Sequence, residues 1–277
     1  MRMATFNLLH GRSPHDGRVD ADRLTAAVTT LDADILAVQE ADRAQPRSGH
    51  LDLTALAATA LAAPHHRFAA AIVGTPGEQF RTPDHDHDGR HEPCYGIGLI
   101  SRYPARHWQI TRLDPAPLRS PVLTADPDPR LILLRDEPRV LLTAVLDTPH
   151  GPLTVATTHL SFVPGWNLRQ LRTVVRTLRL LPPPRILLGD LNMPAAVAAT
   201  ITGWRPLARR PTYPAVRPRV QLDHILLDPR GAPPALGTVT AVDTPPLDVS
   251  DHRALLVTVA TPTPPAQSPP PTTRRND

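Results

Sequence analysis

The 277-residue chain contains no lysine, so all 30 of its basic side chains are arginines. These arginines are nearly balanced by 26 acidic side chains, and no run of five or six like charges marks an interaction tail. Together with 35 prolines, this composition indicates a bias of the whole genome more than selection for a partner. A formal charge of +4 fits a polyanionic substrate, but a solvated arginine-rich surface explains the charge more simply.

Cysteines and long apolar runs are equally scarce. The single cysteine, Cys94, excludes an internal disulfide framework. No apolar run approaches the roughly 18 residues of a membrane span. The first residues enter a strand-like pattern at once and leave no room for a signal peptide. We therefore expect a cytoplasmic monomer with no membrane span and no evident protein partner.

The chain is long enough to bury a sizeable core, and its pattern predicts one domain over residues 1–260. The proline-rich segment 261–277 is predicted to be a disordered tail. Strand-like runs alternate with apolar faces at helical spacing. The predicted strands are 2–7, 34–40, 68–73, 95–101, 140–146, 153–158, 185–188, 221–227 and 254–259, and the predicted helices are 21–31, 51–63 and 166–181.

The connections between these elements predict a mixed sheet architecture. Strand, helix and strand follow one another over residues 2–40, which favours parallel pairing and places Asn7 and Glu40 at one sheet edge. Residues 140–158 instead predict a hairpin around the turn 149–152. Sheets covered by outer helices fit both features better than a simple doubly wound fold.

Polar residues lie at or beside the ends of apolar strands at six places. The clearest is Gly189-Asp190-Leu191-Asn192, directly after the buried run 185–188. A charge at the rim of a core must be paired or bind something. The other positions are Asn7, Glu40, His159, Asp223, and Asp251 with His252. If they share one rim, their carboxylates repel unless a cation neutralises them, and oxygen ligands suit Mg²⁺ or Mn²⁺ better than zinc.

In this order the motifs resemble those of the endonuclease/exonuclease/phosphatase superfamily, which has the DNase I-like fold. The resemblance covers about residues 1–260. It implies an α/β (α+β) four-layer sandwich, with two mixed β-sheets packed face to face and helices outside, and divalent-metal hydrolysis of phosphate esters. The segments that carry it are Thr5-Phe6-Asn7, Gln39-Glu40, residues 98–104, Thr158-His159, residues 189–192, Asp223-His224-Ile225 and Ser250-Asp251-His252.

The resemblance also implies a role for each site residue. Glu40 would be the main ligand of Mg²⁺ or Mn²⁺, with Asn7 and Asp251 completing the site. Asp190 would position or deprotonate the attacking water, and Asn192 would hold the phosphate or the nucleophile. His252, hydrogen-bonded to Asp223, and His159 would contact the phosphate. Whether Asp190 or His252 is the base stays open at this point.

The substrate is less constrained than the chemistry. Gln39-Glu40-Ala41-Asp42-Arg43 lacks the lysine that typically follows the metal-binding glutamate of the abasic-site nucleases. We interpret the chain as a phosphodiesterase with endonuclease-like chemistry that acts on a phosphate-ester substrate, with nucleic acid as the first candidate. The alternatives are a lipid or small-molecule phosphodiesterase or phosphatase, similar to sphingomyelinases or inositol phosphatases, and a non-catalytic binding protein. The last is disfavoured because Glu40, His159 and His252 are all present.

Two further segments gave weaker signals. Residues 84–89 match the first half of a calcium loop, D-x-D-x-D-G, but the twelfth position is Tyr95 instead of glutamate. We interpret residues 84–92 as an acidic loop. The segment 162–166, which holds Phe162 and Trp166, is equally consistent with a substrate-facing aromatic patch and with packing onto the helix that follows.

Overall fold

Two mixed β-sheets form the centre of the computed structural model, which describes residues 1–84, 92–117, 119–123 and 131–260. The seven-stranded sheet has the order β14-β15-β1-β2-β5-β3-β4, and the six-stranded sheet has the order β12-β13-β11-β10-β9-β6. The first comprises β14 (Val239–Asp243), β15 (Leu255–Val259), β1 (Arg2–Asn7), β2 (Ile35–Arg43), β5 (Cys94–Ser101), β3 (His65–Gly74) and β4 (Phe80–Arg81). The second comprises β12 (Arg205–Pro206), β13 (Asp223–Leu227), β11 (Arg185–Asp190), β10 (Gly151–His159), β9 (Arg139–Thr148) and β6 (Ala105–Leu113).

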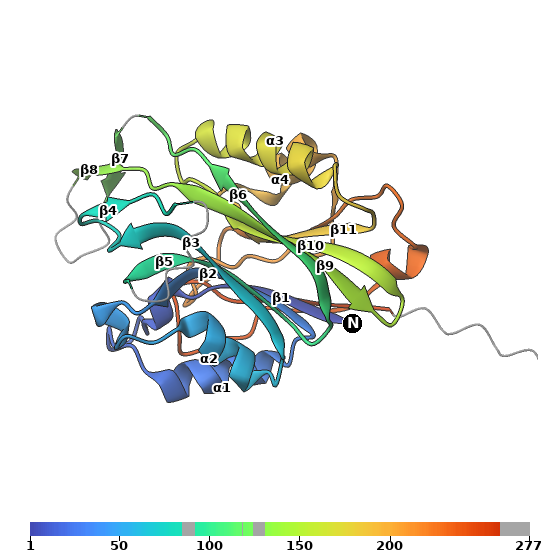
Figure 1. The fold of residues 1–277 in the computed structure, drawn as a ribbon, viewed down its shortest axis with the longest axis horizontal. Helices are drawn as coiled ribbons and strands as arrows, with labels where there is room; N and C mark the ends of the chain where they lie inside the picture. Colours follow the sequence, from blue (N-terminus) through green and yellow to red (C-terminus); the bar gives the residue numbers. More distant parts are fainter. Residues whose placement is uncertain (85–91, 118, 124–130, 261–277) are drawn as a thin grey trace, which may run out of the picture.

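The helices cover the outer faces of the two sheets (Figure 1). Helices α1 (Ala21–Leu31) and α2 (Leu53–Ala60) lie on the seven-stranded sheet, and α3 (Trp166–Leu178) and α4 (Ala195–Thr202) lie on the six-stranded sheet. Asp20 and Asp52 cap α1 and α2 by accepting hydrogen bonds from backbone N–H groups of their first turns. A small two-stranded sheet, β7 (Arg119–Leu123) and β8 (Leu131–Arg135), and three short 3₁₀ turns complete the described elements.

Three apolar clusters hold these four layers together. One joins α1 and α2 to the first sheet, around Phe6 and Leu24. A second fills the space between the sheets, around Leu142 and Leu188, and a third joins α3 and α4 to the second sheet, around Leu171. The predicted four-layer sandwich is therefore confirmed.

Most predicted elements are present, and the parallel pairing of the first two strands is confirmed by the register Asn7↔Gln39. The hairpin of β9 and β10 is confirmed as well. The sequence interpretation missed β6, β7, β8, β12, β14 and α4. It also treated residues 74–94 as one loop, although Phe80–Arg81 form β4. Strand β6 is a partly exposed edge strand of mixed polarity, so it lacks the apolar run by which buried strands are found.

Some predictions concern residues that the structure does not describe. Most of the 84–92 loop and the whole tail 261–277 are in this group. In the described ranges, no helix combines the length and apolarity that crossing a membrane requires.

Candidate active site

The site lies at one end of the space between the two sheets. Along each central strand, inward-facing residues alternate with outward-facing ones. In β11 the inward series runs from Ile186 and Leu188 in the central core to Asp190. The same period of two places Asn7 and His159 at the last positions of β1 and β10, and Asp223 at the first position of the antiparallel strand β13. The apolar layer between the sheets thus becomes polar at this end of the strands.

Three predicted residues form one row across the six-stranded sheet. His159 on β10 pairs with Asp190 on β11, and Asp190 pairs with Asp223 on β13. Gly189 makes this row possible because a Cβ at its position would lie 2.1 Å from the carbonyl oxygen of Thr158. Its φ of 148° is also in the region that favours glycine. Strands β10 and β11 therefore approach closely at the position just before His159 and Asp190.

A bulge in β2 brings Glu40 to this end of the sandwich. Gln39 faces the other sheet, where its Nε2 donates to Thr157 Oγ1 (3.0 Å), and Ala41 packs on the helix side. Regular alternation would send Glu40 toward the helices. The register between β2 and β5 shifts between Val38 and Ala41, and Glu40 adopts a φ of 52° as the extra residue. Such backbone strain is typical of a functional site.

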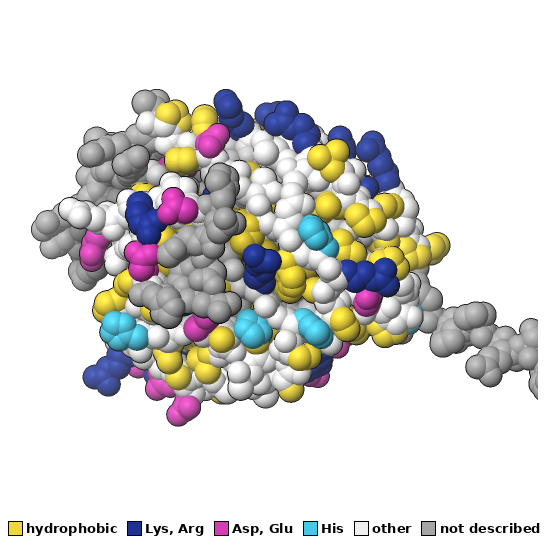
Figure 2. All heavy atoms as spheres, viewed as in Figure 1, with side chains coloured by type: hydrophobic (Ala, Val, Ile, Leu, Met, Phe, Trp, Pro, Cys, Tyr) yellow, Lys and Arg dark blue, Asp and Glu magenta, His cyan; other side chains and the backbone are white. Residues whose placement is uncertain are grey.

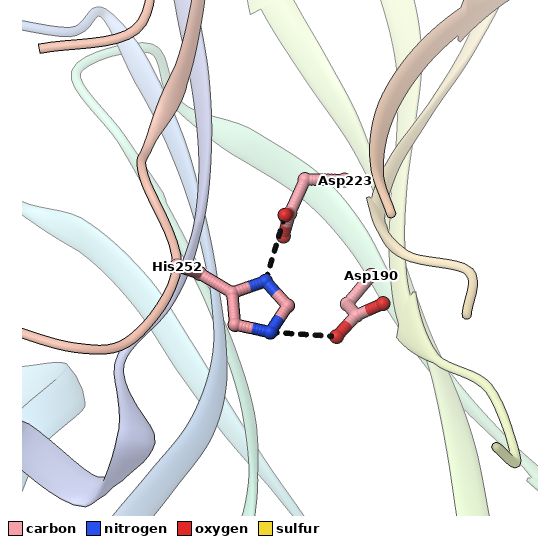
Figure 3. A group of neighbouring side chains, drawn as sticks. All are labelled: Asp190, Asp223 and His252. Carbon is pink, nitrogen blue, oxygen red and sulfur yellow. Dashed lines mark hydrogen bonds and ion pairs between the residues drawn. The ribbon is translucent and has the colours of Figure 1, made fainter. Parts of the chain in front are cut away.

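His252 lies between two buried carboxylates (Figure 3). Its Nδ1 is 2.8 Å from Asp223 Oδ2, and its Nε2 is 3.9 Å from Asp190 Oδ2. The turn before β15 fixes this position, since the His252 backbone N–H donates to Ser250 Oγ (3.1 Å). The ring of Tyr213 packs beside the imidazole with centroids 4.9 Å apart. The predicted pairing of His252 with Asp223 is therefore present.

Two amides connect the remaining site residues. Asn7 Nδ2 donates both to Glu40 Oε1 (3.0 Å) and to Asp190 Oδ2 (3.1 Å), so it joins the two sheets. The backbone N–H of Asn192 donates to Asp190 Oδ1 (2.9 Å). The Asn192 side chain lies 3.2 Å from His159 Nε2 and donates to the carbonyl oxygen of Leu160 (2.9 Å). All eight predicted residues, Asn7, Glu40, His159, Asp190, Asn192, Asp223, Asp251 and His252, meet in this region.

A cleft of about 1140 Å³ opens above these residues. Its lining includes Tyr95, Glu137, Arg139 and Tyr213, which the sequence interpretation did not place at the site. Arg139 lies at the start of β9, whereas the search for polar residues followed strand ends. The hairpin register Leu141↔Thr158 places the start of β9 beside the end of β10. The antiparallel pairing of the predicted hairpin was therefore the signal that could have identified Arg139 as a neighbour of His159.

Burial and neighbouring charges strongly perturb the site. Burial raises the pKa of Glu40, and the like charge of Asp251 adds to this effect. Burial together with Asp223 raises the pKa of Asp190 to about 7. For His252, burial opposes the charged form, but Asp223, Asp190 and Asp251 outweigh it and raise the pKa to about 10. His252 is therefore an imidazolium near neutral pH.

The residues around Glu40 fit a hard divalent cation. Glu40 is half-buried beside the like charge of Asp251, and Asn7 donates to only one of its oxygens. Carboxylate and amide oxygens are the ligands that Mg²⁺ and Mn²⁺ prefer. A second set of potential ligand atoms, from Asp190, Asp223 and His252, lies within 4.8 Å of one another. The raised pKa of His252 disfavours that set, because an imidazolium cannot bind a metal.

Comparison with known proteins agrees with this arrangement. The sequence profile of the endonuclease/exonuclease/phosphatase family matches residues 4–252. The chain belongs to this family. Its members are generally divalent-metal-dependent hydrolases of phosphate esters, so the broad chemistry of the cleft is that of a phosphoesterase. No curated protein sequence matches the chain.

Solved structures of the family share the fold. An endonuclease/exonuclease/phosphatase from Beutenbergia cavernae superimposes with a TM-score of 0.64 at 23% identity, covering 94% of this chain and 71% of that one. The mannosyl-6-phosphatase of Bacteroides thetaiotaomicron gives 0.60 at 15% identity, over 94% and 100% of the two chains. Sphingomyelinase C of Streptomyces griseocarneus gives 0.57 at 16% identity, over 94% and 99%. At these identities the likeness concerns the fold alone.

Proposed function

We propose that this family member is a Mg²⁺- or Mn²⁺-dependent phosphodiesterase with endonuclease-like chemistry. The observation that carries the proposal is the series Asp223–His252–Asp190, in which His252 is hydrogen-bonded to Asp223 and ion-paired with Asp190 at 3.9 Å. This series faces Glu40 and Asn7 across the end of the sandwich. One side supplies proton transfer and phosphate binding, and the other supplies oxygen ligands. A cytoplasmic location and a monomeric state stay predictions from the sequence.

Each residue has a defined part in this proposal. Glu40, Asn7 and Asp251 would hold the cation, which neutralises phosphate charge and stabilises the leaving oxygen. Asp190 accepts the proton of the attacking water, since its pKa of about 7 suits a general base near neutral pH. His252 already carries a proton there and cannot be that base. His252 instead donates to a phosphate oxygen, together with His159 and Asn192.

Nucleic acid is the first substrate class because of the charge beside the cleft. The loop holding Phe162, which lines the cleft, leads directly into α3. The exposed face of α3 carries Arg169, Arg172 and Arg176, and none of them forms an ion pair within the described part of the chain. Figure 2 shows a concentration of dark blue side chains over this helix. A phosphate backbone leaving the cleft would meet these charges.

A small-molecule or lipid phosphoester is the second candidate, and one observation favours it. The cleft itself is lined by Arg139 and two histidines but also by five carboxylates: Glu40, Glu78, Glu137, Asp190 and Asp251. Even with a bound cation, this balance suits a substrate with one phosphate group better than a long polyanion. The two candidates therefore predict different substrate preferences.

A substrate panel separates these candidates. Purified protein would be assayed with Mg²⁺, Mn²⁺ or EDTA on plasmid and oligonucleotide DNA, RNA, sphingomyelin, inositol phosphates and bis-p-nitrophenyl phosphate. We expect EDTA-sensitive cleavage of nucleic acid. Faster turnover of a small ester or of sphingomyelin would select the second candidate.

Variants at the site complete the test. Glu40→Ala and His252→Ala should each abolish the EDTA-sensitive activity. Equal rates for both variants and the wild type, on every substrate, would favour a non-catalytic binding protein on the same fold.

A further inference from the structure

Arg139 is a buried cation in contact with His159. The residue is 5% exposed, and its Nη1 lies 3.2 Å from His159 Nδ1. Its Nη2 lies 3.5 Å from Oδ1 of Asp136. Asp136 also accepts a hydrogen bond from the backbone N–H of Ala116 (2.7 Å). The guanidinium is therefore held between a buried carboxylate and the imidazole.

This contact restricts the imidazole. A guanidinium has only donors and keeps its proton at all accessible pH values. Arg139 can therefore donate to His159 Nδ1 only if that nitrogen carries no hydrogen. A neutral imidazole has one N–H, which must then be on Nε2. An imidazolium has hydrogens on both nitrogens, so its Nδ1–H would point at an N–H of Arg139 and no hydrogen bond could form.

Of the two groups around Nε2, the Asp190 carboxylate favours this tautomer and the Asn192 amide nitrogen opposes it. Asp190 Oδ2, an acceptor, lies 3.6 Å from Nε2. Asn192 Nδ2 lies 3.2 Å away, and its orientation is fixed because it donates to the carbonyl oxygen of Leu160. Burial, Arg139 and His252 all lower the pKa of His159, which keeps the ring neutral. The charge-assisted bond from Arg139 outweighs a neutral bond from Asn192 to Nε2.

We infer that Arg139 is a positioning residue that holds His159 as its neutral Nε2–H tautomer. Both His159 and Asn192 line the cleft, so their N–H groups are two donors 3.2 Å apart with no shared acceptor between them. A phosphate oxygen placed against both would accept both bonds. His159 then donates a hydrogen bond without transferring its proton, and protonation of the leaving group falls to other groups.

This inference rests on the proposed function for its catalytic meaning, but its test does not need turnover. The ring nitrogens of ¹⁵N-histidine in the full chain, in EDTA at neutral pH, report which nitrogen carries the proton. The signals of His159 are those that disappear in His159→Gln. We expect an unprotonated Nδ1 and a protonated Nε2 in the wild type. A proton on Nδ1, or on both nitrogens, would overturn the inference.

Variants at Arg139 test the cause. Arg139→Gln can accept as well as donate, so the Nδ1–H tautomer should gain population and kcat should fall about tenfold through partial loss of one donor. Arg139→Lys keeps a cationic donor and should retain the wild-type tautomer. An unchanged tautomer in Arg139→Gln would exclude the proposed role. If Arg139→Gln does not fold, the inference is still tested by the wild type and by Arg139→Lys, which must both show the Nε2–H tautomer.

Asp136→Asn is the matched control. It disturbs the same buried ion pair but leaves the contact between Arg139 and His159, so the tautomer and kcat should stay near the wild-type values. A tautomer change as large as that in Arg139→Gln would mean that general packing, and not the guanidinium, determines the tautomer of His159. A wild type with the expected tautomer but no phosphoesterase activity would refute the proposed function alone.

Discussion

Asn7 Nδ2 donates to Asp190 Oδ2 across 3.1 Å, and this bond joins the last residue of β1 to the last residue of β11. The two residues belong to different sheets and are 183 positions apart in sequence. The same amide nitrogen also holds Glu40. The proposed metal ligands and the proposed base are therefore fixed relative to one another by a single side chain.

Replacement of Glu40 by glutamine should separate metal binding from stability. We expect Mg²⁺ or Mn²⁺ affinity, measured by calorimetry, to fall at least about a hundredfold, since even residues behind the ligands contribute about 10–100-fold. The metal-free variant should melt at the same or a higher temperature, because burial disfavours the Glu40 charge. Glu78→Gln, an exposed carboxylate of the same cleft, should change neither quantity.

Asp190→Asn should remove turnover without unfolding the protein. Loss of a general base lowers kcat by about 10²–10⁴. Since the pKa of Asp190 is raised to about 7, its charge is unfavourable above that pH. In EDTA at pH 8, the variant should therefore melt no lower than the wild type. A large drop in melting temperature would contradict the assignment.

Asp228→Asn is the control, because it should lower stability and leave turnover unchanged. Asp228 is buried and pairs with Arg185 at 2.9 Å, on strand ends away from the cleft. Removing one partner of a buried ion pair costs about 3–5 kcal/mol. We expect lower stability in urea with kcat preserved.

The charge of His252 should set the alkaline limit of activity. Its pKa is raised from 6.5 to about 10 mainly by Asp223, so activity should decline as pH rises through about 10. In Asp223→Asn this limb should move down by about one to three pH units. Stability in EDTA has the same sign: the contribution of His252 is complete below 6.5 and is lost as pH rises through about 10. An unshifted limb would exclude the pair as its origin.

Gly189→Ala should destabilise the junction of β10 and β11. The added Cβ would lie 2.1 Å from the Thr158 carbonyl oxygen, at a φ of 148°. Strain and displacement of the strand together should cost about 3 kcal/mol or more in urea denaturation. Gly203→Ala is the control, because Gly203 has a φ of 67° but nothing within 4 Å of the added Cβ. Its cost should be about 1 kcal/mol.

The arginines of α3 should matter only for a polyanionic substrate. In Arg169→Gln/Arg172→Gln/Arg176→Gln, DNA binding should weaken, and the salt slope should fall by about 0.9 for each phosphate that the protein no longer neutralises. Turnover of bis-p-nitrophenyl phosphate should be unchanged. Fluorescence titration between low and physiological salt measures the DNA affinity and its salt slope, and steady-state kinetics measures the turnover.

Charge removal elsewhere controls for this experiment. Arg18→Gln/Arg67→Gln/Arg230→Gln removes three exposed arginines that are outside α3. Equal loss of DNA affinity in both triple variants would show that net charge, and not the α3 face, governs binding.

The sequence alone predicted the fold family and most of the residues that we propose for the site. Apolar runs that end in Asn7, Glu40, His159 and Asp190 are visible because a buried strand needs apolar side chains and a polar residue at its end is an exception. The parallel β1–β2 pair and the β9–β10 hairpin follow from connection lengths, and the structure has both.

Only the tertiary structure decided how those residues meet. The bulge at Glu40 changes the facing of one side chain, and local sequence cannot show it because it depends on the register with β5. Arg139 begins its strand, and its contact with His159 comes from the antiparallel register. The pKa values of Asp190 and His252 depend on burial and on charges from distant segments. The pattern of apolar and polar residues thus predicts where strands end. The strand register and the packing between the sheets determine which side chains meet there and what their pKa values are.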